Sequence, residues 1–307
     1  MPSACKPFDM PSRSNCQQCR RLLVVGVLLG VLWLPSLAAE AAEDSVRWHI
    51  VETANFRLLS YGQHPASREV AEHCEQLRAD LAAKWFSNRP DDDWSPKCDL
   101  VLHSSDASYL REVGPGGRSS LASALVDRHE GRIAARRVDI RASQGDWRNS
   151  ALAHELVHVI LADRFAHDSL PRWINEGAAI LADPPEKRLR HGRDVRRAVA
   201  AGAHFRLAEL LALPDYPPQG RWSTFYDQSA DLVDYLVQQQ GHARFATFVE
   251  ISLEHGYDQA TRTVYGCGLA ELERRWQRSL SSPRQSRLGS YFPSDRLTPA
   301  SGGAKDS

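Results

Sequence analysis

Two histidines and a glutamate stand at the spacing that many metal-dependent hydrolases use. The chain reads H-E-L-V-H over residues 154–158, so about one helical turn separates His154 from His158, and both imidazoles project from one face. Two imidazole nitrogens that close on one cation are typical of zinc, and Glu155 would lie beside a water on that ion. The pattern also occurs by chance on surface helices, so a third ligand is needed.

A candidate for the third ligand follows in the next apolar segment. Residues 170–179 read L-P-R-W-I-N-E-G-A-A and include Glu176, and Pro171 suits the first turn of a helix. If that helix runs antiparallel to the first, after a loop over 162–170, Glu176 returns over the two histidines. Its neighbours argue against a solvent-exposed helix because they are apolar: Trp173, Ile174, Ala178, Ala179 and Ile180. Two histidines, one glutamate and an open position predict a catalytic site for a single Zn2+.

Such a site predicts hydrolysis of an amide or peptide bond. A bound Zn2+ lowers the pKa of its water towards neutrality, and Glu155 can take the proton and pass it to the leaving amine. The sequence therefore predicts a zinc metallopeptidase that acts on peptide or protein substrates. Two alternatives stay open. One is a zinc-dependent hydrolase of another amide, because the site does not name the acyl group, and the other is a non-catalytic binding module of the cell envelope on the same fold.

The two segments together carry a family resemblance. H-E-L-V-H followed by P-R-W-I-N-E-G-A-A resembles the gluzincin zinc metallopeptidases, and most closely the bacterial peptidase MA-like family, over about residues 48–280. The resemblance implies a zincin-like metallopeptidase fold, with zinc ligands at His154, His158 and Glu176 and the general base at Glu155. It also implies a downstream Tyr or His that donates to the oxyanion. Tyr226 is the candidate here, and a core aromatic residue at a helix start is the alternative interpretation.

Other residues near the motifs are candidates to support the site. Asp183 and Asp163 are spaced so that either could hydrogen-bond the imidazole nitrogen that does not face the metal. Asn175 could orient the general base or a substrate backbone. By the gluzincin resemblance, a sheet edge above the zinc helix pairs with extended substrate. The strand predicted over 132–141 is the candidate for that edge, with an ordinary buried strand as the alternative. Basic residues over 187–197 could recognise an acidic substrate, although a solvated helix face is the simpler interpretation.

The elements that must position these residues change character along the chain. Short β-branched and apolar runs predict about four strands, with one or two over 48–60 and one each over 98–103, 121–126 and 132–141. A helix is predicted over 66–86 and a hairpin turn over 127–131. Helical periodicity then dominates, over about 149–165, 171–183, 186–202, 222–240, 242–254 and 268–280. Strands followed by helices predict an α+β fold, with a small, mostly antiparallel N-terminal sheet and a mainly helical half.

The N-terminal segment 1–41 has the pattern of a secretory signal peptide. Arg20 and Arg21 precede an apolar run over 22–34, and small residues follow, so cleavage is expected near residue 38 or 41. An uncleaved N-terminal membrane anchor is the alternative. We therefore expect an exported protein, periplasmic or extracellular.

The rest of the chain divides into a catalytic domain and a tail. The domain is expected over 42–280, with its sheet part over about 46–145 and its helical part over about 146–280. The tail over 281–307 is rich in Ser, Pro, Gly and Arg and has few apolar residues, which predicts disorder.

The overall composition excludes other classes of partner. The chain of 307 residues carries 38 basic and 38 acidic side chains, so a formal net charge of zero removes the attraction to phosphate on which nucleic-acid binders rely. No second apolar run of about 18 residues follows the leader, so stable membrane insertion is not expected after signal cleavage. In an exported chain we expect Cys74 to pair with Cys98 and Cys267 to stay free, although sequence alone cannot fix the pairing. The sequence leaves the oligomeric state open.

Overall fold

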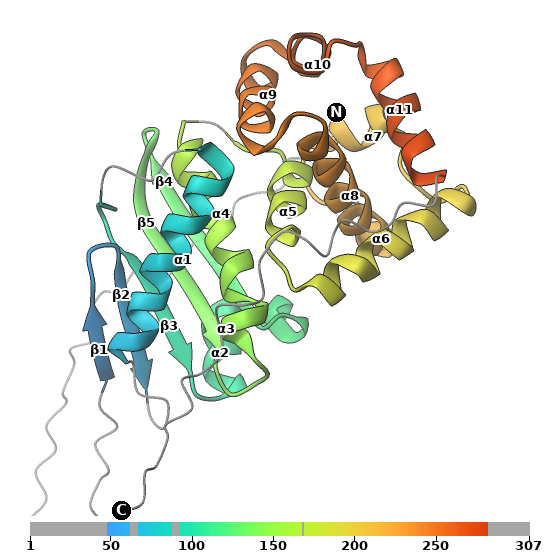
Figure 1. The fold of residues 1–307 in the computed structure, drawn as a ribbon. Helices are drawn as coiled ribbons and strands as arrows, with labels where there is room; N and C mark the ends of the chain where they lie inside the picture. The colour runs from blue at the N-terminus through green and yellow to red at the C-terminus, as the bar shows by residue number, and fades with distance from the viewer. Residues whose placement is uncertain (1–47, 62–66, 88–92, 168, 282–307) are drawn as a thin grey trace, which may run out of the picture. The chain divides into compact units, whose positions relative to one another are not determined.

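The computed structural model describes residues 48–61, 67–87, 93–167 and 169–281 of the chain. Figure 1 shows a sheet built by the N-terminal half of this part, followed by a set of helices. The predicted signal peptide lies outside the described residues, and so does the predicted tail apart from Ser281, which ends the last helix. None of the described helices has both the length and the hydropathy to span a lipid bilayer.

The sheet is mixed, which corrects the prediction of a mostly antiparallel one. The pairs β1/β2 and β4/β5 are antiparallel, whereas β2/β3 and β3/β5 are parallel. A parallel pair needs a crossover connection, and the helix α1 (Arg68–Phe86) supplies one between β2 and β3. The described strands follow the order β1-β2-β3-β5-β4, with bounds β1 (Trp48–Glu52), β2 (Phe56–Tyr61), β3 (Cys98–His103), β4 (Ala122–His129) and β5 (Arg132–Arg141).

The hairpin of β4 and β5 is tighter than predicted. β4 continues to His129, so only Glu130 and Gly131 form the turn, in place of the expected 127–131. Both turn residues have positive φ, 51° and 73°, as a type I′ turn requires. A Cβ at Gly131 would also overlap the ring of His167, so glycine is needed there for space as well. The longer β4 forms an edge of the sheet, and β5 lies inside it.

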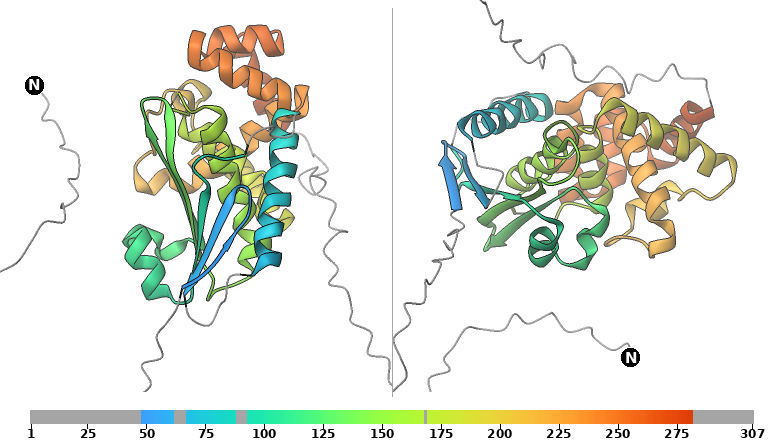
Figure 2. Two further views of the ribbon diagram at one scale, coloured as in Figure 1. Left: turned by 90° about the vertical axis from the view of Figure 1, so that its left-hand side faces the viewer. Right: turned by 90° about the horizontal axis from the view of Figure 1, so that it is seen from below.

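Helices pack on both faces of the sheet. Figure 2 shows α1 on one side of the strands and α2 (Asp106–Val113) on the other, and α4 (Leu152–Arg164) packs on β4, β5 and α1. Alternation along β3 places Leu100 and Leu102 in the core on the side of α1 and α4. This face therefore anchors the helix that carries the two histidines.

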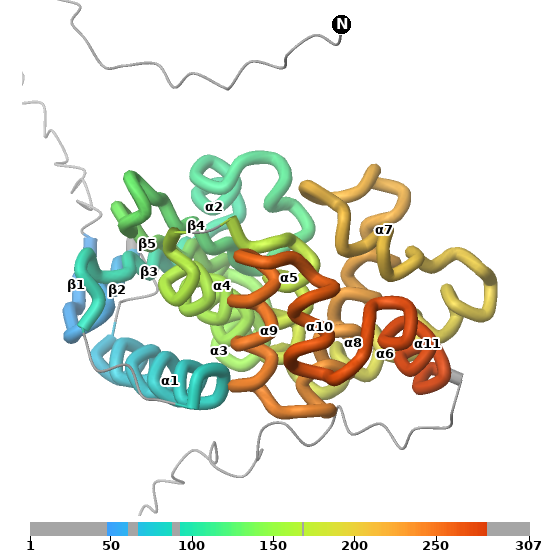
Figure 3. Tube along the Cα trace, turned by 90° about the horizontal axis from the view of Figure 1, so that it is seen from above, coloured from blue at the N-terminus to red at the C-terminus, as the bar shows by residue number. Residues whose placement is uncertain are grey.

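The C-terminal half is helical, as predicted, and α8 (Trp222–Gln240) is its most buried helix. α8 contacts α5, α6 and α9. Figure 3 shows α6, α8 and α11 on the side of α4 away from β1. Two hydrogen bonds of 2.8 Å join the Gln228 side chain to the backbone of Phe205, which anchors the segment before α7. The other helices are α3 (Trp147–Ser150), α5 (Arg172–Ile180), α6 (Pro185–Ala200), α7 (Leu207–Leu211), α9 (His242–His255), α10 (Tyr257–Tyr265) and α11 (Leu269–Ser281).

Some short elements have no counterpart in the sequence pattern. The helices α2, α7 and α10 were outside the predicted segments, as were the 3-10 helices Pro115–Ser119 and Gln219–Arg221. Each is shorter than the window over which helical periodicity can be recognised. Three of these connecting elements border the cleft described below: α2, α7 and the 3-10 helix Pro115–Ser119.

The cysteines of the described chain are free thiols, so the expected Cys74–Cys98 disulfide is absent. Both side chains are fully buried in the main hydrophobic core. Burial raises the pKa of the Cys74 thiol to about 12 and also raises that of Cys98. The two residues therefore act as small apolar core side chains.

Candidate metal centre

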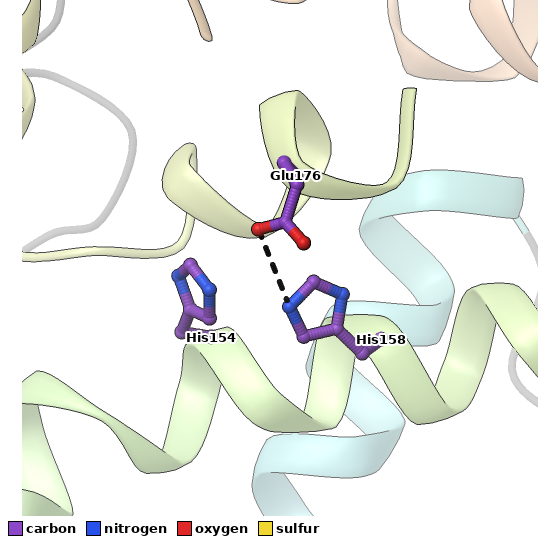
Figure 4. Close-up of side chains that lie close together, drawn as sticks. All are labelled: His154, His158 and Glu176. Carbon is purple, nitrogen blue, oxygen red and sulfur yellow. Dashed lines mark ion pairs between the residues drawn. The ribbon is translucent and has the colours of Figure 1, made fainter. Parts of the chain in front are cut away.

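The two histidines of the H-E-L-V-H segment lie one turn apart on α4. The ring centroids of His154 and His158 are 4.9 Å apart, and Figure 4 shows both rings on the same side of the helix. Leu152, Leu156 and Val157 are fully buried in the core. The apolar side chains thus hold α4 in the core while both imidazoles stay partly exposed.

Glu176 approaches the histidines from α5. One ligand atom from each of the three side chains lies within 4.8 Å of the others, and Glu176 Oε2 is 3.9 Å from His158 Nε2. Figure 4 shows the carboxylate over the two rings. The structure therefore brings His154, His158 and Glu176 together, and two imidazole nitrogens with one carboxylate oxygen suit Zn2+.

The residue after Glu176 explains how α5 comes so close to its neighbour. A Cβ at Gly177 would lie 2.5 Å from the backbone oxygen of Ser229 and 2.6 Å from Val233 Cγ2, both on α8. Only glycine fits that contact without a shift of one helix. Gly177 therefore sets the distance between α5 and α8, and with it the position of the carboxylate.

Each histidine is also held through its second nitrogen. His154 Nδ1 lies 3.2 Å from Asp183 Oδ1, and His158 Nδ1 lies 3.0 Å from Asn175 Oδ1. These contacts occupy Nδ1 and leave Nε2 of each ring for a metal. Asp183 takes the supporting position that its spacing suggested, whereas Asn175 contacts His158 and not Glu155, the predicted general base.

The charge of Asp183 is compensated on both sides. The side chain is fully buried, and Lys187 Nζ lies 2.8 Å from its second oxygen. Burial alone would raise the pKa of Asp183, but His154 and Lys187 bring it below its usual range. Burial alone would lower the pKa of His154. The charge and hydrogen bond of Asp183 outweigh that effect, so the pKa of His154 is raised. A charged carboxylate therefore fixes the orientation of the His154 ring.

Tyr216 is a site residue that the sequence analysis missed. Its hydroxyl donates a hydrogen bond to Glu176 Oε1. Burial and the neighbouring Glu176 raise the pKa of Tyr216, so the phenol stays protonated and remains a donor. The residue lies between α7 and α8, where no helix or strand periodicity marks it. The prolines at 214, 217 and 218, which favour a defined loop, are the only local signal.

Tyr226, the predicted oxyanion donor, stands in the first turns of α8. Its ring centroid is 6.1 Å from that of Tyr216, and its side chain is half-buried. Burial and the charge of Glu176 raise the pKa of Tyr226, which a hydrogen bond with Tyr216 only partly offsets. Its phenol is therefore protonated at neutral pH and able to donate.

A cleft of about 1050 Å³ opens over these side chains. Glu155, which is 9% exposed, and Tyr226 line it together with the three candidate metal ligands. The other walls come from β4, from the start of α5, from the segment before α8 and from the 3-10 helix Pro115–Ser119. A stretch of β4 therefore lines the same cleft as the candidate metal ligands.

The strand edge that borders the cleft is β4, and residues 132–141 form an interior strand, which confirms the alternative interpretation of that segment. Those residues form β5, which is paired with β3 on one side and β4 on the other, so its backbone has no free edge. Five consecutive residues of β4, from Ala122 to Val126, line the cleft, and Leu125 is 62% exposed. Because the hairpin folds β5 back against β3, the edge of the sheet is formed by β4, although β5 is nearer to α4 in the sequence.

Two further sets of residues that the sequence suggested for the site, Asp163 and the basic residues over 187–197, do not line the cleft. Asp163 does not contact either histidine, because it pairs with Arg136 and accepts a hydrogen bond of 3.0 Å from Trp94 Nε1. The basic residues over 187–197 lie on α6 and do not line the cleft. They belong mainly to the surface of that helix, apart from the buried Arg188 and the Lys187 contact with Asp183.

Comparison with known proteins supports a metallopeptidase. The family model of the Peptidase MA superfamily matches residues 133–282, which contain both the H-E-L-V-H segment and Glu176. The match supports a zincin-like metallopeptidase superfamily, whose members are typically zinc-dependent. It thereby supports a peptidase or hydrolase. No curated protein matches the chain.

Proposed function

We propose that this protein is an exported zinc metallopeptidase of the gluzincin type, which hydrolyses peptide bonds with Glu155 as general base. One observation carries the proposal: His154, His158 and Glu176 converge within 4.8 Å at an open cleft that Glu155 also lines. The export part of the proposal rests on the signal-peptide pattern over residues 1–41.

The residues present fit a zinc ion, because donor types, spacing and supporting contacts agree. His154, His158 and Glu176 would hold it, and Asp183 and Asn175 would keep the two imidazoles oriented. When bound, Zn2+ polarises a substrate carbonyl and lowers the pKa of water.

Glu155 would carry out the proton transfers. Its carboxylate would accept a proton from the attacking water and then deliver it to the nitrogen of the leaving amine. The side chain is nearly buried in the cleft, which limits competing contact with bulk water. This role requires the carboxylate and not merely a polar group of the same size.

The two tyrosines would divide two tasks. Tyr226 would donate a hydrogen bond to the oxygen that gains negative charge as water attacks the carbonyl. Tyr216 would hold Glu176 in place, because its hydroxyl already donates to Glu176 Oε1. A phenol suits both tasks since it donates without carrying a charge.

The free edge of β4 favours a peptide over a small amide as the substrate. An extended peptide can add to a sheet edge through main-chain hydrogen bonds, and β4 presents such an edge inside the cleft. A small amide would use neither the edge nor most of the 1050 Å³ volume.

The experiment compares the exported form of the wild type with Glu155→Gln. Both proteins are analysed for zinc and incubated with a mixture of unfolded proteins, and new peptide ends are counted. We expect both to hold zinc, and we expect the rate of cleavage to fall about 10²- to 10⁴-fold in the variant. Glu186→Gln, an exposed glutamate on α6, is the matched control and should cleave at the wild-type rate. Equal rates in wild type and Glu155→Gln would refute the assigned role.

A further inference from the structure

One wall of the cleft carries an arginine on the edge strand. Arg128 is half-buried, lines the cleft, and follows Val126 and Ala124 on the same face of β4. The pairing of β4 with β5 shifts in register between Asp127 and Arg128, where β5 carries one extra residue, Ala134. The fold thus places a cation where a peptide on β4 would pass.

Most of the hydrogen-bonding capacity of Arg128 is unused. Its Nη2 donates to the backbone oxygen of Ala162, in the last turn of α4, at 3.3 Å. Its Nε is buried and makes no hydrogen bond. Within the part of the chain that the structure describes, no Asp or Glu carboxylate forms an ion pair with Arg128. A guanidinium has five N–H donors, so several can still bind a ligand.

The other arginine of the cleft differs in this respect. Arg172, at the start of α5, lies 3.0 Å from Asp215 and stacks over the Tyr216 ring at 5.0 Å. Among the described residues that line the cleft, Asp215 is the only acid apart from Glu155 and Glu176. It pairs with Arg172, so Arg128 is left without an ion-pair partner among these lining residues.

Both arginines mark the same end of the cleft. Arg128 contacts Ala162, which is one turn beyond His158 on α4, and Arg172 is one turn before Glu176 on α5. Since β4 runs from Ala122 to His129, its C-terminal half lies at this end. The positive charge is therefore displaced to one side of the metal centre.

We propose that Arg128 makes the cleft select peptides that carry an aspartate or glutamate on one side of the scissile bond. The proposal rests on the proposed peptidase function and names its substrate class. A peptide extended along β4 alternates its side chains, so a residue a few positions from the scissile bond can point at Arg128. The planar guanidinium of Arg128 can bind a carboxylate of the peptide through two parallel hydrogen bonds. A lysine at the same position of the peptide would instead face a like charge.

A purely structural role for Arg128 makes a different prediction. A cation at the C-terminal end of α4 stabilises the helix by binding its last carbonyl groups. That contribution is the same whichever peptide occupies the cleft. Its loss would lower the melting temperature and slow the cleavage of all peptides alike, so substrate charge separates the two roles.

The test measures kcat/KM on matched quenched peptides that differ at one position. Glu, Gln or Lys is placed in turn at each of several positions on both sides of the scissile bond. For the wild type we expect a preference for Glu over Lys of about tenfold, confined to one side of the bond. Arg128→Gln should remove most of that preference, and Arg128→Glu should reverse it. Arg128→Lys, which keeps the charge and the long side chain, should retain part of it.

Arg132→Glu is the matched control. Arg132 is exposed on the same hairpin, does not line the cleft, and gives the same change in net charge. Its charge preference should equal that of the wild type. An equal loss of preference in Arg132→Glu, or a preference that survives in Arg128→Gln and Arg128→Glu, would overturn the proposal.

A second readout separates this proposal from the proposed function. Binding of the same peptides to zinc-loaded Glu155→Gln is followed by fluorescence anisotropy, which needs no turnover. Tighter binding of the Glu peptides, lost with a second change Arg128→Gln, would support the Arg128 assignment even if the wild type cleaved nothing. Cleavage with no dependence on peptide charge would overturn the Arg128 assignment and leave the peptidase proposal standing.

Discussion

The protein holds two histidine–aspartate–cation groups of similar composition in different settings. The site group lies at the candidate metal centre and consists of His154, Asp183 and Lys187. The sheet group lies on the face of the sheet that α2 covers and consists of His103, Asp139 and Arg137. In both groups a buried carboxylate binds an imidazole and a cation, at 3.2 and 2.8 Å in the site group and 2.7 and 2.8 Å in the sheet group.

The two groups differ in what lies on the other side of the imidazole. The His154 ring is 4.9 Å from the His158 ring, and the Glu176 carboxylate meets both. The His103 ring instead packs edge-on against Tyr109, 5.7 Å away on α2. Within the described chain, His154, His158 and Glu176 are the only group of ligand side chains close enough to share a metal ion. An aspartate therefore contacts a histidine in both places, and only at His154 does a second element, α5, bring a further possible ligand to the histidine pair.

The largest difference between the two groups is expected in metal content, when the histidine of each group is replaced by alanine. His154→Ala should lose the bound zinc, about one ion per chain in the wild type, and all zinc-dependent cleavage with it. His103→Ala should keep the zinc and lose only stability. Elemental analysis of the purified proteins measures the metal content directly. Loss of zinc in both variants, or in neither, would contradict the distinction drawn between the two groups.

The supporting aspartates should show a smaller contrast. Asp183→Asn keeps the size of the side chain but removes the charge that orients His154, so zinc affinity should fall about 10- to 100-fold. Asp139→Asn should leave the affinity unchanged. Competition against a chromophoric chelator gives both dissociation constants. An unchanged affinity in Asp183→Asn would show that Asp183 is not needed to orient the ligand.

A third test concerns α5, the helix that brings Glu176 to the site group and has no counterpart at the sheet group. Gly177→Ala places a methyl group against the backbone of Ser229, and relief of that overlap should cost about 1–3 kcal/mol of unfolding free energy. Because α5 carries Glu176, zinc affinity should fall as well. Urea unfolding of the zinc-free protein measures the first effect. Gly220→Ala, with open space around the added group, is the control and should change the stability little.

The smallest expected effect is a pH dependence of the stability that the sheet group contributes. Burial alone would raise the pKa of Asp139, but hydrogen bonds from His103 and Arg137 bring it below its usual range. A carboxyl whose folded pKa is lowered adds stability above the unfolded pKa of about 3.9, and that stability is lost as pH falls further. We expect Asp139→Asn to cost about 1–2 kcal/mol at pH 6.

The measurement is urea unfolding of zinc-free wild type and Asp139→Asn between pH 6 and pH 3. Working without zinc keeps the metal centre out of the comparison. The difference in unfolding free energy between the two proteins should shrink as the pH falls below about 4. A constant difference over the whole range would show that Asp139 is not held in its charged form.

Much of this protein is readable from local sequence patterns. The H-E-L-V-H segment places two imidazoles on one helix face because a helix repeats every 3.6 residues, whatever surrounds it. The strand over 98–103 and the helix over 222–240 were predicted with the bounds that the structure has. The apolar surroundings of Glu176 indicated a buried second helix, which α5 is. All of these depend on residues a few positions apart.

The site contacts that were missed join residues far apart in the chain. Tyr216 binds Glu176 across 40 positions, and no periodic pattern marks a tyrosine in a loop. Asn175 was recognised as a polar neighbour of the third ligand, but its partner His158 became clear only once α4 and α5 were packed. Such partners depend on which elements meet, and that depends on the packing of the whole core.

By itself, then, the sequence determined the candidate ligands and their spacing, because residue type and helical repeat are local properties. The tertiary structure alone decided which strand borders the cleft, which way the strands run, and which polar side chains hold the ligands. The physical reason is that strand order and helix packing minimise the free energy of the complete core. A single segment has the same pattern whether its neighbour is β3, β5 or solvent.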